Sequence, residues 1–208
     1  MFISIFISLH VIEKHKLHDI GINFSPKEIM LLLAGILTSC IFYIIVILIL
    51  PLLDSNYSFS EFANILMSSA KRGFIGVLVV PLTEELLYRG YILRNTFDKL
   101  KFYQINLLSA LFFSIGHWQY VPGMPLISFL LINMLSTFLI GLVFNNIAKI
   151  TNSIWFGVGL HWFFNYLGLL LFKGSNNLPL SFILFTITFT IFGILITNRI
   201  LKKTKLNS

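Results

Sequence analysis

Residues 30–50 read MLLLAGILTSCIFYIIVILIL, a run that holds no charged side chain and ends at Pro51. The hydrocarbon core of a bilayer is about 30 Å thick, and a helix needs about 20 apolar residues to cross it. The run therefore predicts a membrane-spanning helix. The whole chain of 208 residues is 57% hydrophobic and only 11% charged, which no soluble core could accommodate. We expect an all-α fold, a polytopic transmembrane helical bundle.

Five further segments have the apolar character of a spanning helix, although one of them carries two adjacent acids and an arginine. The expected spans are 30–50, 73–96, 102–120, 125–148, 151–172 and 174–197. Residues 1–12 are apolar but short, so we expect them to lie at the interface or to re-enter the membrane. If they crossed it, the bundle would have seven helices and an external N-terminus.

The expected organisation is a single membrane domain with short ends. The sequence shows no long linker, low-complexity stretch or repeat. We expect an N-terminal interfacial segment over 1–28, a transmembrane domain over 29–200 whose motif core is 73–172, and a basic cytoplasmic tail over 201–208.

The charge distribution predicts the orientation of the bundle. The chain has 15 Lys and Arg against 8 Asp and Glu, a net charge of +7. The basic residues lie at the ends of apolar runs and not in one patch, which disfavours binding of nucleic acid. Most of them fall on the side that holds both termini, so we expect both termini in the cytoplasm. Cys40 is the single cysteine, so no internal disulfide can form.

Five ionisable side chains lie inside the predicted spans, where charge is costly and by default indicates function. Glu85 and Arg89 are four residues apart and can pair on one helix face. Glu84 is rotated by about 100° from Glu85 and is left without a cation on its own helix. Helix rise places Glu84, His117 and His161 near the middle of the membrane.

These residue types suit the hydrolysis of a peptide bond. A carboxylate and an imidazole that face one water form a general-base arrangement, which Glu84 and His117 could provide. An imidazole and an amide can stabilise an oxyanion, which suits His161 and Asn165 one turn apart. Each residue also has a structural interpretation: Glu85 and Arg89 as a neutralised pair, His161 as a packing residue, and Asn165 as a contact between helices.

Three short motifs carry these residues. Residues 84–89 read EELLYR, residues 113–117 read FSIGH, and residues 161–165 read HWFFN. They match the patterns EExxxR, FxxxH and HxxxN, in this order and on separate helices. The chain resembles the CPBP family, which groups CAAX prenyl endopeptidases with bacteriocin-processing and Abi proteins.

The resemblance implies an intramembrane endopeptidase that acts on a membrane-associated peptide or protein within the lipid bilayer. It implies that Glu84 and His117 activate water and that His161 and Asn165 stabilise the oxyanion. Glu85 is also functionally important in the family, and Arg89 would support it. Bacteriocin self-immunity, leader-peptide maturation and control of a sensor pathway are biological roles among which the sequence does not choose. The chain is rich in Phe, Ile, Lys and Asn, as are proteins from bacteria with AT-rich genomes, so we expect the protein to lie in a bacterial cell membrane.

Two alternatives remain open at this stage. The family was first described as metal-dependent, and zinc or another divalent metal would be held by Glu84, His117 and His161. The absence of an HExxH motif favours a metal-free enzyme without a cofactor. The competing function is a non-catalytic membrane immunity or scaffold protein, in which the buried charges only stabilise the bundle. The sequence carries no signal for the oligomeric state.

Overall fold

The computed structural model describes residues 20–53, 74–95, 100–117, 126–171 and 180–206, and all regular structure in these ranges is helical. The segments are α2 (Pro26–Leu53), α4 (Phe74–Glu85), η3 (Leu86–Ile92), α5 (Leu93–Asn95), α6 (Phe102–Gly116), α7 (Leu126–Phe129), η4 (Leu130–Ser136), α8 (Thr137–Thr151), α9 (Trp155–Leu171) and α10 (Leu180–Leu206). Because α4, η3 and α5 are continuous, as are α7, η4 and α8, the described residues form six helices in total, which confirms the predicted number. The expected interfacial segment at 1–12 lies outside the described residues.

Local sequence signals account for the helix ends. Ser25 precedes α2, Pro26 is its first residue, and the hydroxyl of Ser25 donates to the carboxylate of Glu28. Ser25 and Glu28 have the spacing of a capping box, with proline at the first helical position, and here their two side chains bond to each other. Asn152 ends α8 in the left-handed conformation, with φ of 52°. The hydroxyl of Ser153 then accepts a hydrogen bond from the backbone N–H of Trp155 at the start of α9.

Two helix ends differ from the expectation. The span predicted over 102–120 ends as a helix at Gly116, and His117 is its C-cap, with its backbone N–H bonded to Ser114 O over 3.1 Å. Residues 118–120 lie outside the described residues. At the other end of the chain, α10 continues to Leu206 and takes in most of the predicted basic tail. Lysines near a helix C-terminus interact favourably with the helix dipole, which explains the extension.

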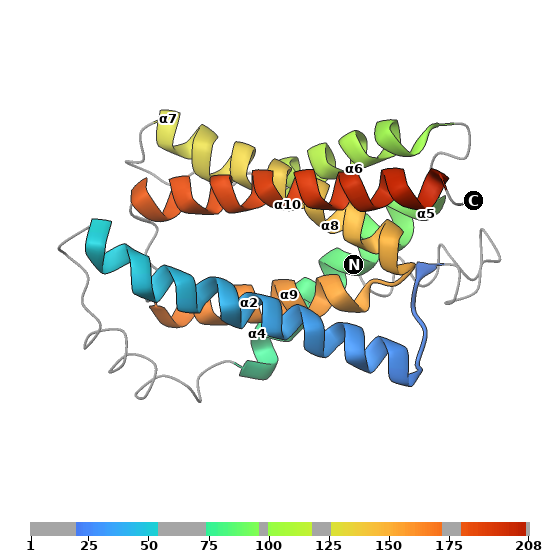
Figure 1. Ribbon diagram of the computed structural model, residues 1–208, viewed down its shortest axis with the longest axis horizontal. Helices are drawn as coiled ribbons and strands as arrows, with labels where there is room; N and C mark the ends of the chain where they lie inside the picture. Colours follow the sequence, from blue (N-terminus) through green and yellow to red (C-terminus); the bar gives the residue numbers. More distant parts are fainter. Residues whose placement is uncertain (1–19, 54–73, 96–99, 118–125, 172–179, 207–208) are drawn as a thin grey trace.

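The helices form two layers (Figure 1). One layer contains α2 and α9, with α4 packed against α9, and the other contains α6, α8 and α10. The helix that begins as α4 ends as α5 beside the second layer, so it connects the two (Figure 1). Glycines allow α2 and α9 to touch through their backbones: a Cβ at Gly35 would lie 2.2 Å from Phe156 O, and one at Gly159 would lie 2.2 Å from Leu32 O.

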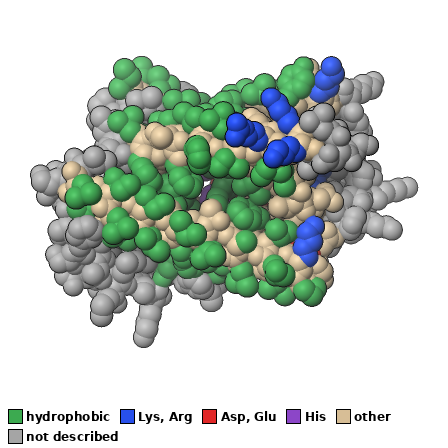
Figure 2. Space-filling model, viewed as in Figure 1, with side chains coloured by type: hydrophobic (Ala, Val, Ile, Leu, Met, Phe, Trp, Pro, Cys, Tyr) green, Lys and Arg blue, Asp and Glu red, His purple; other side chains and the backbone are tan. Residues whose placement is uncertain are grey.

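The outer surface is that of a membrane protein. Large apolar side chains such as Leu37, Leu48 and Phe192 are more than half exposed, and apolar side chains (green) are spread across the described part of the face in Figure 2. Three helical stretches of the described part are long and apolar enough to cross a membrane: Pro26–Ile49, Met134–Thr151 and Ile183–Lys203. The basic side chains in this view gather at one end of the molecule (Figure 2).

Candidate active site

The two adjacent acids sit where the helix changes its winding. The α-helix α4 ends at Glu85, and the π-helix η3 follows over Leu86–Ile92. Single π-helical turns are rare and frequently occur at functional sites. This helix carries Glu84, Glu85 and Arg89, the residues of the EExxxR motif.

Glu85 and Arg89 form the buried ion pair that their spacing predicts. Arg89 NH1 donates to Glu85 Oε1 over 2.9 Å, and both residues are 0% exposed. The guanidinium also lies over two rings, with its carbon 4.3 Å from the centroid of Phe113 and 5.0 Å from that of Phe144. Since two charges this deep are costly unless paired, each partner depends on the other.

Glu84 meets two imidazoles that come from distant parts of the chain. Its Oε2 lies 3.6 Å from Nε2 of His117, at the end of α6, and 3.6 Å from Nε2 of His161, on α9. This buried Oε2 has no hydrogen-bond partner among the described residues. The three atoms are too far apart for direct hydrogen bonds but well placed to share one water. We call Glu84, His117 and His161 the Glu/His cluster.

The hydrogen bond at the other nitrogen of His117 indicates its tautomer. Nδ1 lies 2.8 Å from Phe113 O, and a carbonyl oxygen can only accept, so Nδ1 carries a proton. In the neutral ring Nε2 is then unprotonated and faces Glu84 as an acceptor. Both Glu84 and His117 can therefore take a proton from a water between them.

His161 makes a second contact that sequence spacing alone did not predict. Its Nδ1 lies 3.2 Å from Glu85 Oε1, the same oxygen that Arg89 binds. His161 therefore lies between the two acids, with one ring nitrogen toward each. Gly157, one helical turn earlier on α9, permits the approach, because a Cβ there would lie 2.6 Å from Glu85 Oε2.

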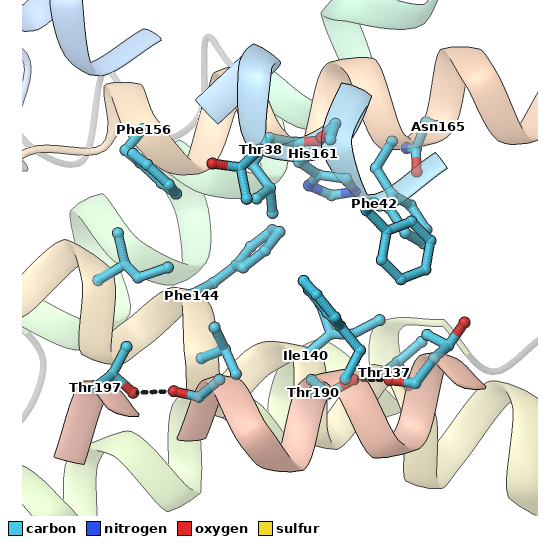
Figure 3. Close-up of a pocket in the computed structure, with 18 of the residues that line it drawn as sticks. Thr38, Phe42, Thr137, Ile140, Phe144, Phe156, His161, Asn165, Thr190 and Thr197 are labelled. Carbon is cyan, nitrogen blue, oxygen red and sulfur yellow. Dashed lines mark hydrogen bonds between the residues drawn. The ribbon is translucent and has the colours of Figure 1, made fainter. Parts of the chain in front are cut away.

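The site opens onto an apolar cavity of about 330 Å³ between the two layers. Asn165, the last residue of the HxxxN motif, lines this cavity together with His117 and His161. Phe144 extends from α8 toward His161 (Figure 3), and their ring centroids are 5.6 Å apart. The rest of the wall is mainly aliphatic and aromatic. Between α2 and α10 the surface is hollowed, and a histidine is visible within (Figure 2).

A network of buried amides lies beside the site, and sequence reasoning missed it. Its members are Asn106, Asn145 and Asn146, all less than 10% exposed. Asn145 Oδ1 accepts from Arg89 Nε over 3.1 Å, and Asn106 Nδ2 donates to Asn146 Oδ1 over 2.8 Å. The signal was present, because amides inside otherwise apolar spans need hydrogen-bond partners.

A metal ion held by Glu84, His117 and His161 is the alternative that the sequence left open. In the ranges that the structure describes, no group of three His, Cys, Asp or Glu side chains has the arrangement of a metal site. We assign the steps proposed below to the side chains of the site.

The fold and the site define a class: a helical membrane protein with carboxylates and imidazoles gathered at a buried cavity. Residues 66–167 match the family model of the Rce1-like type II CAAX prenyl endopeptidases. This match covers just under half of the chain and agrees with the CPBP resemblance of its three motifs. Comparisons with curated proteins and with solved structures gave no match.

Proposed function

We propose that the protein is an intramembrane endopeptidase that hydrolyses a peptide bond of a membrane-associated peptide or protein, without a metal. The family implies peptidase activity. The observation that carries the assignment to residues is the position of Glu84 Oε2, which lies 3.6 Å from Nε2 of both His117 and His161. Glu84, Glu85, His117, His161 and Asn165 form the catalytic site, with Arg89 in support.

The first step is the activation of water by Glu84 and His117. A water between them donates one hydrogen bond to the carboxylate and one to the unprotonated Nε2 of His117. As its oxygen attacks the substrate carbonyl, one proton passes to this pair and a tetrahedral oxyanion forms. The same proton then moves to the leaving amine, the C–N bond breaks, and the site returns to its initial state.

His161 and Asn165 stabilise the oxyanion. Both line the cavity, one helical turn apart on α9. With Nδ1 of His161 bonded to Glu85, its Nε2 can donate only if the ring carries two protons. Such a ring balances the charge, because the two glutamates and Arg89 together leave one negative charge in a buried site. Donors fixed at the developing charge are usually a large contribution to catalysis.

The substrate enters from the bilayer. The cavity wall is largely apolar and the hollow between α2 and α10 lies on the apolar side of the molecule (Figure 2). A membrane-associated peptide can reach this site without passing through water. Bacteriocin maturation and self-immunity are two roles that such a reaction would serve, and the identity of the cleaved peptides distinguishes them.

The test compares the wild type with Glu84→Gln and His117→Ala in proteoliposomes. The probe is a panel of synthetic membrane-associated peptides, with and without a farnesylated CAAX end, and mass spectrometry identifies the products. We expect each variant to lose about 100-fold or more of kcat, since each removes a proton acceptor from the attacking water. Lys203→Ala, at an exposed position on α10, is the control and should keep full activity.

Two results would reject this proposal. Cleavage by Glu84→Gln at the wild-type rate would remove Glu84 from the mechanism. A wild type that cleaves no peptide, combined with a Glu84→Gln strain that keeps the cellular phenotype, would favour the non-catalytic immunity or scaffold role.

A further inference from the structure

Arg89 is held from two sides, and the second side involves a residue outside the three motifs. NH1 of Arg89 donates to Glu85 on its own helix over 2.9 Å, while Nε donates to Oδ1 of Asn145 on α8 over 3.1 Å. The guanidinium is planar and rigid, so two bonds to different helices determine its orientation. Asn145 is 0% exposed and is absent from the cavity wall that the described residues form.

The amide of Asn145 is itself fixed. Its Nδ2 donates to the backbone O and to Oδ1 of Asn106 on α6, each over 3.0 Å. A flipped amide would place its NH₂ group against the N–H donors of Arg89 and its oxygen against the two oxygens of Asn106, and these bonds would be lost. Oδ1 is therefore held toward Arg89.

The contacts continue from Arg89 to the proposed oxyanion site. Glu85 Oε1 binds Arg89 NH1 and also lies 3.2 Å from His161 Nδ1. One line of hydrogen bonds thus runs from Asn145 through Arg89 and Glu85 to His161. A shift of Arg89 would move Glu85 Oε1, which is the partner of His161 Nδ1. The imidazole of His161 would then move too, and with it the Nε2 that faces Glu84.

We propose that Asn145 is a positioning residue for the reaction, which acts through Arg89 and Glu85 on His161. This inference rests on the proposed function. Without the Oδ1 acceptor, the Nε–H of Arg89 would be buried and unpaired, and the guanidinium would have to move to find another partner. NH2 of Arg89 already lacks a partner among the described residues, so the remaining bond to Glu85 would not hold the group alone.

Asn146 provides a matched control. It follows Asn145 on α8, is 1% exposed, and also bonds to Asn106, whose Nδ2 donates to its Oδ1 over 2.8 Å. Its own Nδ2 donates to Thr197 and Asn198 on α10, over 2.9 and 3.1 Å, so its bonds join α8 to α10. The two asparagines match in burial and hydrogen bonding, but only Asn145 binds Arg89.

The experiment measures kcat, KM and Tm for Asn145→Leu and Asn146→Leu on the peptide of the synthetic panel that the wild type cleaves best. We expect Asn145→Leu to lose about 10- to 100-fold in kcat, because misplaced catalytic groups cost this much. KM should stay within about twofold, since Asn145 does not reach the cavity. Asn146→Leu should lower Tm to a similar extent and keep kcat within about threefold. Should either variant fail to fold, Asn145→Ala and Asn146→Ala replace the pair.

A double-variant cycle tests the route of the effect. If Asn145 acts through Arg89, the pair Arg89→Gln with Asn145→Leu should be no slower than Arg89→Gln alone. Two results would overturn the inference and leave the proposed peptidase activity intact. The first is an equal loss of kcat in Asn145→Leu and Asn146→Leu, and the second is a double variant whose loss of kcat is the product of the two single losses. If the wild type cleaves no peptide, both the proposed function and this inference are wrong.

Discussion

At the scale of single residues, the central feature is that His161 lies between two carboxylates that differ in their surroundings. Glu85 is 0% exposed and is bound by Arg89, so its charge is neutralised. The side chain of Glu84 is 19% exposed, forms no ion pair with a Lys or Arg among the described residues, and lies 3.6 Å from each of two imidazole nitrogens. Two adjacent acids thus meet different environments and can take different roles, Glu85 as the fixed partner of His161 and Glu84 as the proposed proton acceptor.

The first prediction at this scale concerns metals. Active protein dialysed against EDTA, and then against 1,10-phenanthroline, should keep its full kcat, because in the proposed mechanism Glu84 and His117 take the proton of the attacking water directly. Elemental analysis of the dialysed protein should find no stoichiometric zinc. Loss of activity that returns with added zinc would contradict this and would make Glu84, His117 and His161 ligands. A zinc-dependent peptidase treated in parallel is the control for chelation.

Sequence reasoning named residues that the structure brings close together, but it did not predict all of their contacts. The pairing of Glu85 with Arg89 follows from a spacing of four residues on one helix, and it was predicted. The contact of His161 with Glu85 depends on how α9 is rotated against α4, which neither spacing nor hydropathy specifies. The same holds for Asn145, whose partner Arg89 is 56 residues away along the chain. Both contacts depend on how the helices pack against one another, which a local sequence pattern does not specify.

At the scale of elements, close approach of helices creates the site. Hydropathy predicted six helices because lipid requires apolar runs of a given length, and all six are present. What it could not predict is which helices touch. Glycines determine part of that: Gly35 and Gly159 let α2 and α9 meet at their backbones, and Gly157 admits the carboxylate of Glu85. Small residues at helix interfaces are the usual means of close packing in membranes.

Gly157→Ala tests this approach. The new Cβ would lie 2.6 Å from Glu85 Oε2 and 3.1 Å from its Cδ, closer than such atoms can remain. Glu85 is held by Arg89 and His161 and cannot swing away cheaply, so we expect kcat to fall about tenfold through misalignment. Overpacking should also cost about 1–3 kcal/mol of stability, measured as a lower Tm.

The control for this variant is Gly168→Ala on the same helix. Its Cβ would lie 2.8 Å from the hydroxyl of Tyr43, a similar crowding at a distance from the Glu/His cluster. Tm should change while kcat stays within about twofold. If Gly168→Ala lowered kcat as much as Gly157→Ala, the loss would reflect general disturbance of α9 and not the position of Glu85.

At the scale of the whole molecule, one end of the bundle is basic and internally connected. Lys27 at the start of α2 donates to Thr151 O at the end of α8 over 3.0 Å. Arg94 in α5 donates to Asn152 Oδ1 over 3.1 Å. Lys202 and Lys203 are exposed near the end of α10, and the basic side chains in Figure 2 gather at this same end. A positive end is expected on the cytoplasmic side of a bacterial membrane.

The orientation can be measured with single cysteines, because Cys40 is the only native one. In a Cys40→Ser background, Lys27→Cys and Lys203→Cys should react with a membrane-impermeant maleimide only after cells are permeabilised. Ser58→Cys, in the segment predicted to lie outside, should react in intact cells, whereas Leu195→Cys on the apolar face of α10 should stay unlabelled in both. Labelling of Lys27→Cys or Lys203→Cys in intact cells would show that the bundle has the opposite orientation. The hollow between α2 and α10 would face the bilayer in either orientation, so this result bears on which side releases the products and not on how the substrate enters.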